Sequence, residues 1–150
     1  MANETAATIL KLAADKENEA HWFYKKAARR VKDPGAKTML KDLAEEELKH
    51  KALLEDFDPA RVKDWQPQHI QDLRISDFLV DRVISEDSSP QEIMIYAMKR
   101  EDKAKAFYKQ AAAGTSDASV RKTFDMLAEE EAKHKLKLEK LYDEVILKEN

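Results

Sequence analysis

The sequence contains nearly the same acidic stretch twice: residues 43–51 read LAEEELKHK and residues 127–135 read LAEEEAKHK. In each copy a histidine follows the last glutamate by three residues, which places both side chains on one face of an α-helix. One such stretch would be typical of a solvated helix surface with salt bridges. The second copy indicates that the pattern has a further role.

The similarity between the two halves of the chain extends well beyond these stretches. With an offset of 84 residues, residues 10–57 align with residues 94–141 without a gap, and 19 of the 48 aligned positions are identical. The pattern E..A..FYK.AA begins at Glu17 and again at Glu101. A match of this length at a fixed offset indicates a duplicated structural unit.

Each unit is predicted to be a helical hairpin, the first over about residues 5–57 and the second over about residues 90–147. Asp33 suits an N-cap and Pro34 the first helical position, so they separate a helix of residues 5–31 from one of residues 34–57. In the second unit, residues 89–92 read SPQE, a capping box that starts a helix. Residues 114–117 end this helix, and a fourth helix follows to about residue 147.

Residues 58–89 connect the two hairpins and contain two prolines, which argue against one continuous helix. We expect a crossover along the bundle, with a short apolar helix near residues 78–84. Since the chain has 38% charged residues and only 2 glycines, its composition also favours long helices. The sequence therefore predicts an all-α fold, a four-helix bundle of two duplicated antiparallel hairpins, in a single domain over residues 1–150.

Composition excludes several classes of site and partner. Without cysteine, the chain has no disulfide, thiolate zinc site, iron–sulfur cluster or cysteine nucleophile. The net charge of −3 gives no reason to expect nucleic acid or a membrane as partner. The N-terminus becomes charged too early for a secretory signal, and no apolar run is long enough for a bilayer. We expect a soluble cytoplasmic protein.

Apolar residues recur in steps of three and four along each expected helix, as in packed bundle helices. A glutamate interrupts each of these apolar seams near its middle, and a histidine follows it in two of them. The interrupting residues are Glu17, Glu47, His50, Glu101, Glu131 and His134.

These residues are expected at one height in the bundle. Glu17 lies 17 residues before Pro34, and Glu47 and His50 lie 13 and 16 residues after it. At about 1.5 Å per residue, all three lie roughly 20–25 Å from the turn. Glu101 and Glu131 keep the same 30-residue separation as Glu17 and Glu47. Four carboxylates and two imidazoles are therefore predicted to share one layer of the core.

Such a layer is unstable by itself, because unpaired buried charges are costly and like carboxylates repel one another. No lysine or arginine occupies the seams. Two divalent cations would cancel the four negative charges and bind the histidines as well. Oxygen-rich coordination with one histidine per metal suits iron or manganese better than a structural zinc site. The alternative is a duplicated bundle without metal.

With these residues, the chain resembles the rubrerythrins of the ferritin-like diiron carboxylate superfamily, over both hairpins. The resemblance implies a ferritin-like fold in which the six residues hold two iron ions, with manganese or a mixed pair as alternatives. It implies that Glu47 and Glu131 bridge the metals and that Glu17 and Glu101 are more terminal. It also implies a homodimer and a reaction with hydrogen peroxide or dioxygen, as in oxidative-stress defence.

The chain departs from the family pattern in two respects. It has no rubredoxin-type iron site on four cysteines, so electrons would come from a separate donor protein. Rubrerythrins also have an additional ligating glutamate three residues from the first one on the third helix, where this chain has Met98 and Ala104. This second departure weakens the expectation of peroxidase turnover, but not that of iron binding.

Two tyrosines, Tyr24 and Tyr108, lie seven residues after Glu17 and Glu101 on the same stripes. We expect them to orient the ligating carboxylates, and to supply a proton or an electron in the reaction. The alternative is a pair of core tyrosines whose hydroxyls find an unrelated partner.

Other polar and aromatic residues are expected to have no part in the site. His21 is expected at the surface, because Lys105 is its counterpart in the repeat, and His69 is expected to be structural. The acidic residues expected to be solvated are Glu45, Glu46, Glu129 and Glu130, and the residues expected to contribute only packing are Trp22, Met94, Met98 and Phe107.

The leading functional hypothesis is a non-haem diiron oxidoreductase that acts on hydrogen peroxide or dioxygen. A second hypothesis is iron storage or delivery with ferroxidase activity, which would require a hollow multi-subunit shell. A third is a helical interaction module stabilised by its metal.

Overall fold

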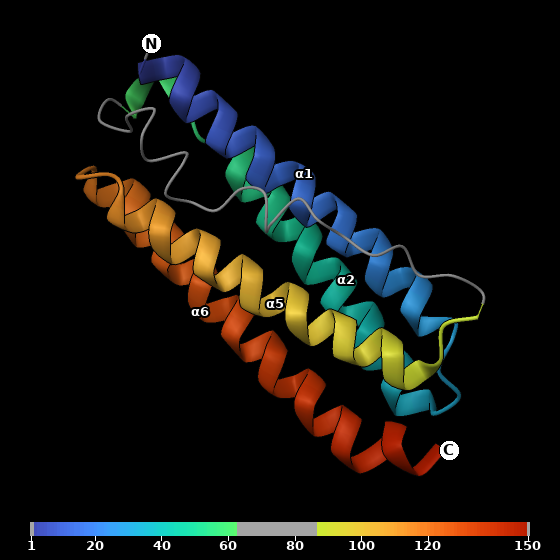
Figure 1. The fold of residues 1–150 in the computed structure, drawn as a ribbon. Coiled ribbons are helices and arrows are strands. Elements are labelled where there is room, and N and C mark those ends of the chain that lie inside the picture. Colours follow the sequence, from blue (N-terminus) through green and yellow to red (C-terminus); the bar gives the residue numbers. More distant parts are fainter. Residues whose placement is uncertain (1, 63–86, 150) are drawn as a thin grey trace.

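The computed structural model describes residues 2–62 and 87–149 and shows a bundle of four long α-helices (Figure 1). These are α1 (Ala2–Ala28), α2 (Pro34–Glu55), α5 (Pro90–Ala113) and α6 (Ala118–Leu141). A short 3₁₀ turn, η1 (Pro59–Arg61), follows α2, while a π-helical turn, η2 (Tyr142–Ile146), and a 3₁₀ turn, η3 (Leu147–Glu149), follow α6. The described part of the chain contains no strand. The predicted all-α four-helix bundle of ferritin-like type is confirmed.

Polar caps fix the starts of three helices, as the sequence predicted for two of them. The side chain of Asp33 accepts a hydrogen bond from the backbone N–H of Ala36, at 2.9 Å. Ser89 and Glu92 form the reciprocal capping box, with N···O distances of 3.1 and 3.3 Å. Asp117 caps α6 through the N–H of Val120. Each contact satisfies a backbone donor that the first turn of a helix leaves unpaired.

The two hairpins are formed by α1 with α2 and by α5 with α6, and Figure 1 shows the two helices of each running antiparallel. α1 ends at Ala28 and α2 at Glu55, two to three residues before the predicted ends. The fourth helix is regular only to Leu141 and continues as the π-helical turn.

The described ends of the connection lie at opposite ends of the bundle. Val62 is fully buried in a core cluster that also contains Ile9, near the start of α1. At the other side of the connection, the carbonyl of Ser88 accepts a hydrogen bond from Arg30, just beyond the end of α1. The chain therefore passes from one end of the bundle to the other, as predicted. The apolar helix expected at residues 78–84 and the structural role expected of His69 lie outside the described residues.

The hydrophobic core consists of two separate clusters, one at each end of the bundle. The first includes Leu54, Phe107 and Phe124, and the second includes Leu40, Met94 and Leu138. Between them lies the layer of buried glutamates and histidines. Each cluster shields one side of this layer from water. None of the described helices has the length and apolar character that crossing a membrane would require.

Two leucines of α6 allow a test of this core. Leu138 is fully buried in the second cluster, whereas Leu136 is 66% exposed. We expect Leu138→Ala to lower the free energy of unfolding by about 2–5 kcal/mol, since it removes buried methyl groups and leaves a cavity. Leu136→Ala should change it by less than about 0.5 kcal/mol. Urea unfolding followed by circular dichroism measures both changes. Equal effects would show that the face of α6 that carries Leu138 is not the one packed against the core.

Candidate metal centre

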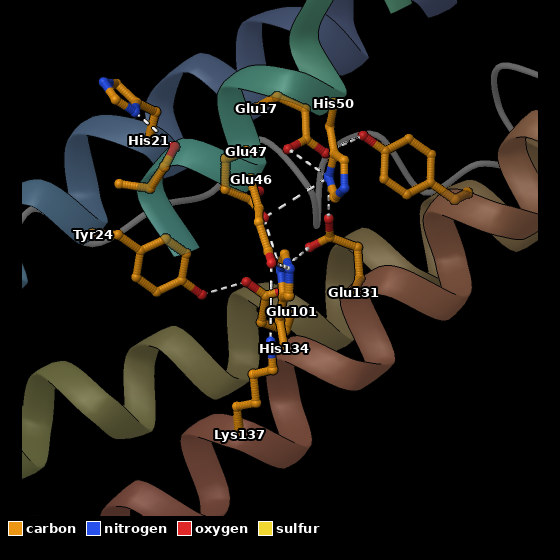
Figure 2. Close-up of polar contacts among 12 residues, drawn as sticks. Glu17, His21, Tyr24, Glu46, Glu47, His50, Glu101, Glu131, His134 and Lys137 are labelled. Atoms are coloured by element: carbon orange, nitrogen blue, oxygen red, sulfur yellow. Dashed lines mark hydrogen bonds and ion pairs between the residues drawn. The ribbon is translucent and has the colours of Figure 1, made fainter. Parts of the chain in front are cut away.

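The six residues that interrupt the apolar seams lie together at the middle of the bundle (Figure 2). One glutamate comes from α1 and one from α5, and a Glu-x-x-His pair comes from each of α2 and α6. All six are buried, with exposed fractions between 0% and 8%. They are Glu17, Glu47, His50, Glu101, Glu131 and His134.

These six side chains form two groups that could each hold a metal ion. The first consists of Glu17, Glu47, His50 and Glu131, and the second of Glu47, Glu101, Glu131 and His134. In each group, one potential ligand atom per residue lies within 4.8 Å of all the others. Glu47 and Glu131 belong to both groups, so they stand where bridging carboxylates would be needed.

Each group depends on residues from both hairpins. His50 Nδ1 lies 3.0 Å from Oε1 of Glu131, and His134 Nδ1 lies 2.8 Å from Oε1 of Glu47. The same nitrogens lie 3.5 Å from Oε2 of Glu17 and 3.6 Å from Oε2 of Glu101, respectively. Neither hairpin alone contains a complete group. The duplication therefore creates the site only when the two hairpins pack together.

Several buried atoms in the layer have no hydrogen-bond partner. They are Oε2 of Glu17, Oε1 of Glu47, Oε2 of Glu101 and Nδ1 of His134. A buried polar atom without a partner is costly, and the cost is larger for charged groups. All four atoms belong to residues of the two groups, and all are electron-pair donors in the ionised carboxylate or neutral imidazole. The donor set therefore fits divalent cations.

The pKa shifts of the buried glutamates also fit a site for divalent cations. Burial raises the pKa of Glu47 and Glu131 well above the ordinary 4.5, and the charge of Glu101 raises both further. Burial also acts to raise the pKa of Glu17, but hydrogen bonds with Glu47 and His50 outweigh it and lower this pKa. Without metal, the two shared carboxyls therefore retain protons that a metal ion would displace.

Both tyrosines contact the layer, and each crosses from its own hairpin to the other. The Tyr24 hydroxyl donates a hydrogen bond to Glu101, and the Tyr108 hydroxyl donates one to Glu17. Burial raises the pKa of both hydroxyls well above 10, and the accepting carboxylates raise it further. The hydroxyls therefore stay protonated as donors. Their expected part in supplying a proton or an electron remains a prediction.

Glu46 contacts the layer, although the sequence did not predict this contact. It was expected to be solvated, but it is half-buried and its Oε2 lies 2.5 Å from Nε2 of His134. The contact holds the ring so that Nδ1 faces the carboxylates. Residues beside a packed seam can reach the neighbouring helix, which is the one signal in the sequence that could have pointed to Glu46. Its repeat counterpart, Glu130, instead lies 3.5 Å from Lys133.

Two further expectations were wrong. His21 was expected at the surface, but it is only 3% exposed, and its Nδ1 donates a hydrogen bond to the carbonyl of Ala44 at 2.7 Å. This contact between α1 and α2 accounts for its burial, and His21 belongs to neither metal-ligand group. Trp22 was expected to pack in the core, but its side chain is 59% exposed and lies edge-on to the His21 ring. Met94 and Phe107 are buried as expected.

Two cationic side chains lie beside the layer, although no lysine or arginine occupies the apolar seams themselves. Lys16 is only 6% exposed, and its ammonium reaches Oε2 of Glu19 at 3.0 Å. Lys16 and Arg100 immediately precede Glu17 and Glu101 in the sequence, and both line a pocket that reaches the carboxylates. A residue next to a seam position can bury its aliphatic stem and extend its charge outward.

Comparison with known proteins identifies the family. The family model described as Rubrerythrin matches residues 8–142, a span that includes nearly all of both hairpins and all six residues of the layer. Searches among curated proteins and among solved structures found no match. Since the family model covers nearly the whole chain, the protein belongs to the rubrerythrin family.

Proposed function

We propose that this protein is a diiron oxidoreductase that reacts with hydrogen peroxide or dioxygen and takes its electrons from a separate donor protein. One observation carries the proposal: four carboxylates and two imidazoles form two ligand groups that share Glu47 and Glu131. Family membership supports iron as the metal. Four buried carboxylates and two divalent cations also balance in charge, which removes the electrostatic cost of the layer.

In this proposal the six residues have distinct roles. Glu47 and Glu131 would be shared by the two ions, His50 and His134 would each hold one ion through Nδ1, and the remaining two glutamates would be terminal ligands. When bound, the two ferrous ions supply the two electrons that, with two protons, reduce hydrogen peroxide to two molecules of water. The hydrophobic clusters on both sides of the layer exclude water from the centre.

The tyrosines position the terminal ligands. Each hydroxyl holds one carboxylate oxygen, of Glu101 or Glu17, which leaves the other oxygen directed at the metal group. Because the hydroxyls stay protonated, they also place a proton beside each terminal carboxylate. Glu46 has the corresponding role for His134. It accepts a hydrogen bond from the Nε2–H group, which fixes the tautomer whose Nδ1 is available to a metal ion.

Anaerobic titration with Fe(II) tests the proposal. We expect two ions to bind per chain, and the bound iron to develop near-ultraviolet absorption on addition of hydrogen peroxide, and more slowly with oxygen. Glu47→Ala and His134→Ala should abolish stoichiometric binding, while Glu45→Ala, at an exposed position next to the site, should not. A wild-type protein that binds no iron would overturn the proposal. A large multi-subunit cage in size-exclusion chromatography would instead favour the alternative, iron storage.

The pH dependence of the metal-free protein provides a second test. Glu47 and Glu131 hold their protons more tightly in the folded than in the unfolded chain, whose ordinary pKa is 4.5. The unfolded chain therefore binds fewer protons above this value, and stability falls as the pH rises from about 5 toward 8. His134, whose pKa is raised by Glu101 and Glu46 against the effect of burial, acts in the same direction.

We therefore expect the melting temperature of the metal-free protein to decrease between pH 5.5 and pH 8. Glu131→Gln removes one of the ionising groups and should flatten this dependence. Saturating divalent metal should reverse it, because binding displaces protons and is favoured at higher pH. Differential scanning calorimetry in matched buffers measures all three. A metal-free protein that is more stable at pH 8 would show that the carboxylates ionise without cost.

Glu46 and Glu130 form a matched pair for a third test. Glu46 contacts His134, whereas its repeat counterpart Glu130 contacts Lys133. We expect Glu46→Ala to lower the affinity for Fe(II) by roughly 10- to 100-fold, which is typical for a residue that orients a ligating histidine. Glu130→Ala should change it by less than about threefold, as expected for an exposed ion pair of little energetic effect. Anaerobic titration against a competing chelator measures both; equal affinities would exclude the orienting role of Glu46.

A further inference from the structure

Four side chains with rings follow one another in α1, and the first two of them belong to neither ligand group. Residues 21–24 read HWFY, whereas the equivalent residues of the second repeat, 105–108, read KAFY. The shared Phe–Tyr pair includes the tyrosine that contacts the layer. His21 and Trp22 occur in the first repeat alone, so the duplicated site does not account for them.

Trp22 belongs to an exposed face of α1 that is otherwise cationic. Lys25, Lys26 and Arg29 follow it at spacings of three, four and seven residues, which places all four side chains on one side of the helix. All four are exposed, and the ammonium of Lys25 lies 5.7 Å from the centre of the Trp22 ring. The equivalent positions of α5 hold alanine, lysine, glutamine and alanine. We call these four residues of the first repeat the tryptophan face.

The charge of this region contrasts with that of the whole chain. Residues 20–32 contain five cationic and no acidic residues, in a chain with a net charge of −3. Two lysines of α2 add to them: the ammonium of Lys37 lies 3.1 Å from a carbonyl oxygen in the last turn of α1, and that of Lys51 lies 3.2 Å from Asn18 Oδ1. The exposed acids between these lysines on α2 are Asp42 and Glu45, so positive charge predominates.

The exposed ring also has a short connection to the two helices of its hairpin that carry ligands. Trp22 lies edge-on to His21, with 5.0 Å between the ring centres, and Nδ1 of the buried His21 donates a hydrogen bond to the Ala44 carbonyl at 2.7 Å (Figure 2). His21 follows Glu17 by one turn in α1, and Ala44 precedes Glu47 by one turn in α2. Electrons tunnel more readily through packed and hydrogen-bonded atoms than across solvent, so these contacts favour electron transfer from Trp22 to the layer.

A cationic surface around one exposed tryptophan fits an acidic redox protein as its occupant. Redox partners dock through small interfaces from which they dissociate again. Opposite charges raise the rate of such encounters, and tryptophan is among the side chains that contribute most to interface affinity. The tryptophan face combines both properties and adds the connection to the ligand-bearing helices.

We propose that the tryptophan face docks the acidic protein that supplies electrons to the metal centre. The inference rests on the proposed function, which requires a separate donor. Each encounter passes one electron from the donor to the centre, so the donor is oxidised once each time. Two encounters therefore replace the two electrons that the reduction of one hydrogen peroxide consumes, and no covalent bond forms or breaks at the face.

The experiment uses a reduced plant-type [2Fe–2S] ferredoxin as the probe, a small acidic protein that donates one electron. Iron-loaded protein is first oxidised with stoichiometric hydrogen peroxide and then mixed with the probe in an anaerobic stopped-flow spectrometer. We expect reduction of the centre with a second-order rate constant that falls steeply as ionic strength rises, because salt screens the attraction between the proteins.

Matched variants locate the docking face. Lys25→Glu should lower this rate constant roughly fivefold or more at low salt. Lys109→Glu, the same change at the equivalent exposed position of α5, should lower it by less than about twofold. Trp22→Ala should lower it roughly tenfold, whereas Trp22→Phe, which keeps an aromatic ring, should retain most of it. The effect of Lys25→Glu should disappear at about 1 M salt.

Dithionite, a small reductant that needs no docking face, separates docking from the metal centre. We expect it to reduce the wild type and all four variants at similar rates. Equal ferredoxin rates in the wild type, Lys25→Glu and Trp22→Ala would overturn the docking face and leave the metal centre intact. The same conclusion would follow if ferredoxin failed to reduce a wild type that dithionite reduces.

Two further outcomes complete the test. Parallel losses with ferredoxin and dithionite would also count against the docking face, because the substitutions would then act on the centre itself. A wild type that binds no Fe(II), or whose bound iron hydrogen peroxide does not oxidise, would overturn the proposed function instead.

Discussion

The burial of four carboxylates in one layer is the constraint on which the rest of this structure depends. The layer divides the core into two hydrophobic clusters, and each cluster contributes one tyrosine whose hydroxyl crosses to a carboxylate of the opposite hairpin. The hydrogen bonds satisfy only part of the layer, since four buried atoms keep no hydrogen-bond partner. Divalent cations would complete this arrangement and stabilise the fold, and their binding would then be coupled to the packing of the hairpins.

Duplication explains the symmetry of the centre, and small departures from it distinguish the two ligand groups. The reciprocal contacts His50–Glu131 and His134–Glu47 follow from two similar hairpins packed face to face. Glu46 reaches His134, whereas Glu130 lies beside Lys133, so the two halves differ in what surrounds them. Such differences make the two ligand groups inequivalent in what surrounds their histidines.

The ligand set could be predicted because its signal is periodic. Glu17 and Glu101 interrupt the apolar seams at equivalent heights, and helical geometry alone brings them to the level of the Glu-x-x-His pairs. Residues beside the seams were predicted poorly. Glu46 is one position from Glu47 and was assigned to solvent, and His21 was assigned to the surface because its counterpart is a lysine. Both contact another helix, and this depends on interhelical distance and rotation, which periodicity does not define.

The sequence by itself determined the helices, their pairing into hairpins and the six residues of the central layer. These follow from local capping chemistry, from a repeat at fixed offset and from hydrophobic periodicity, all of which act within one helix or one hairpin. Only the tertiary structure decided which histidine nitrogen faces the carboxylates, which carboxylate each tyrosine contacts, and which cations border the pocket. Each of these depends on how the two hairpins face each other, and a shift of a few ångströms between helices would change every one of them.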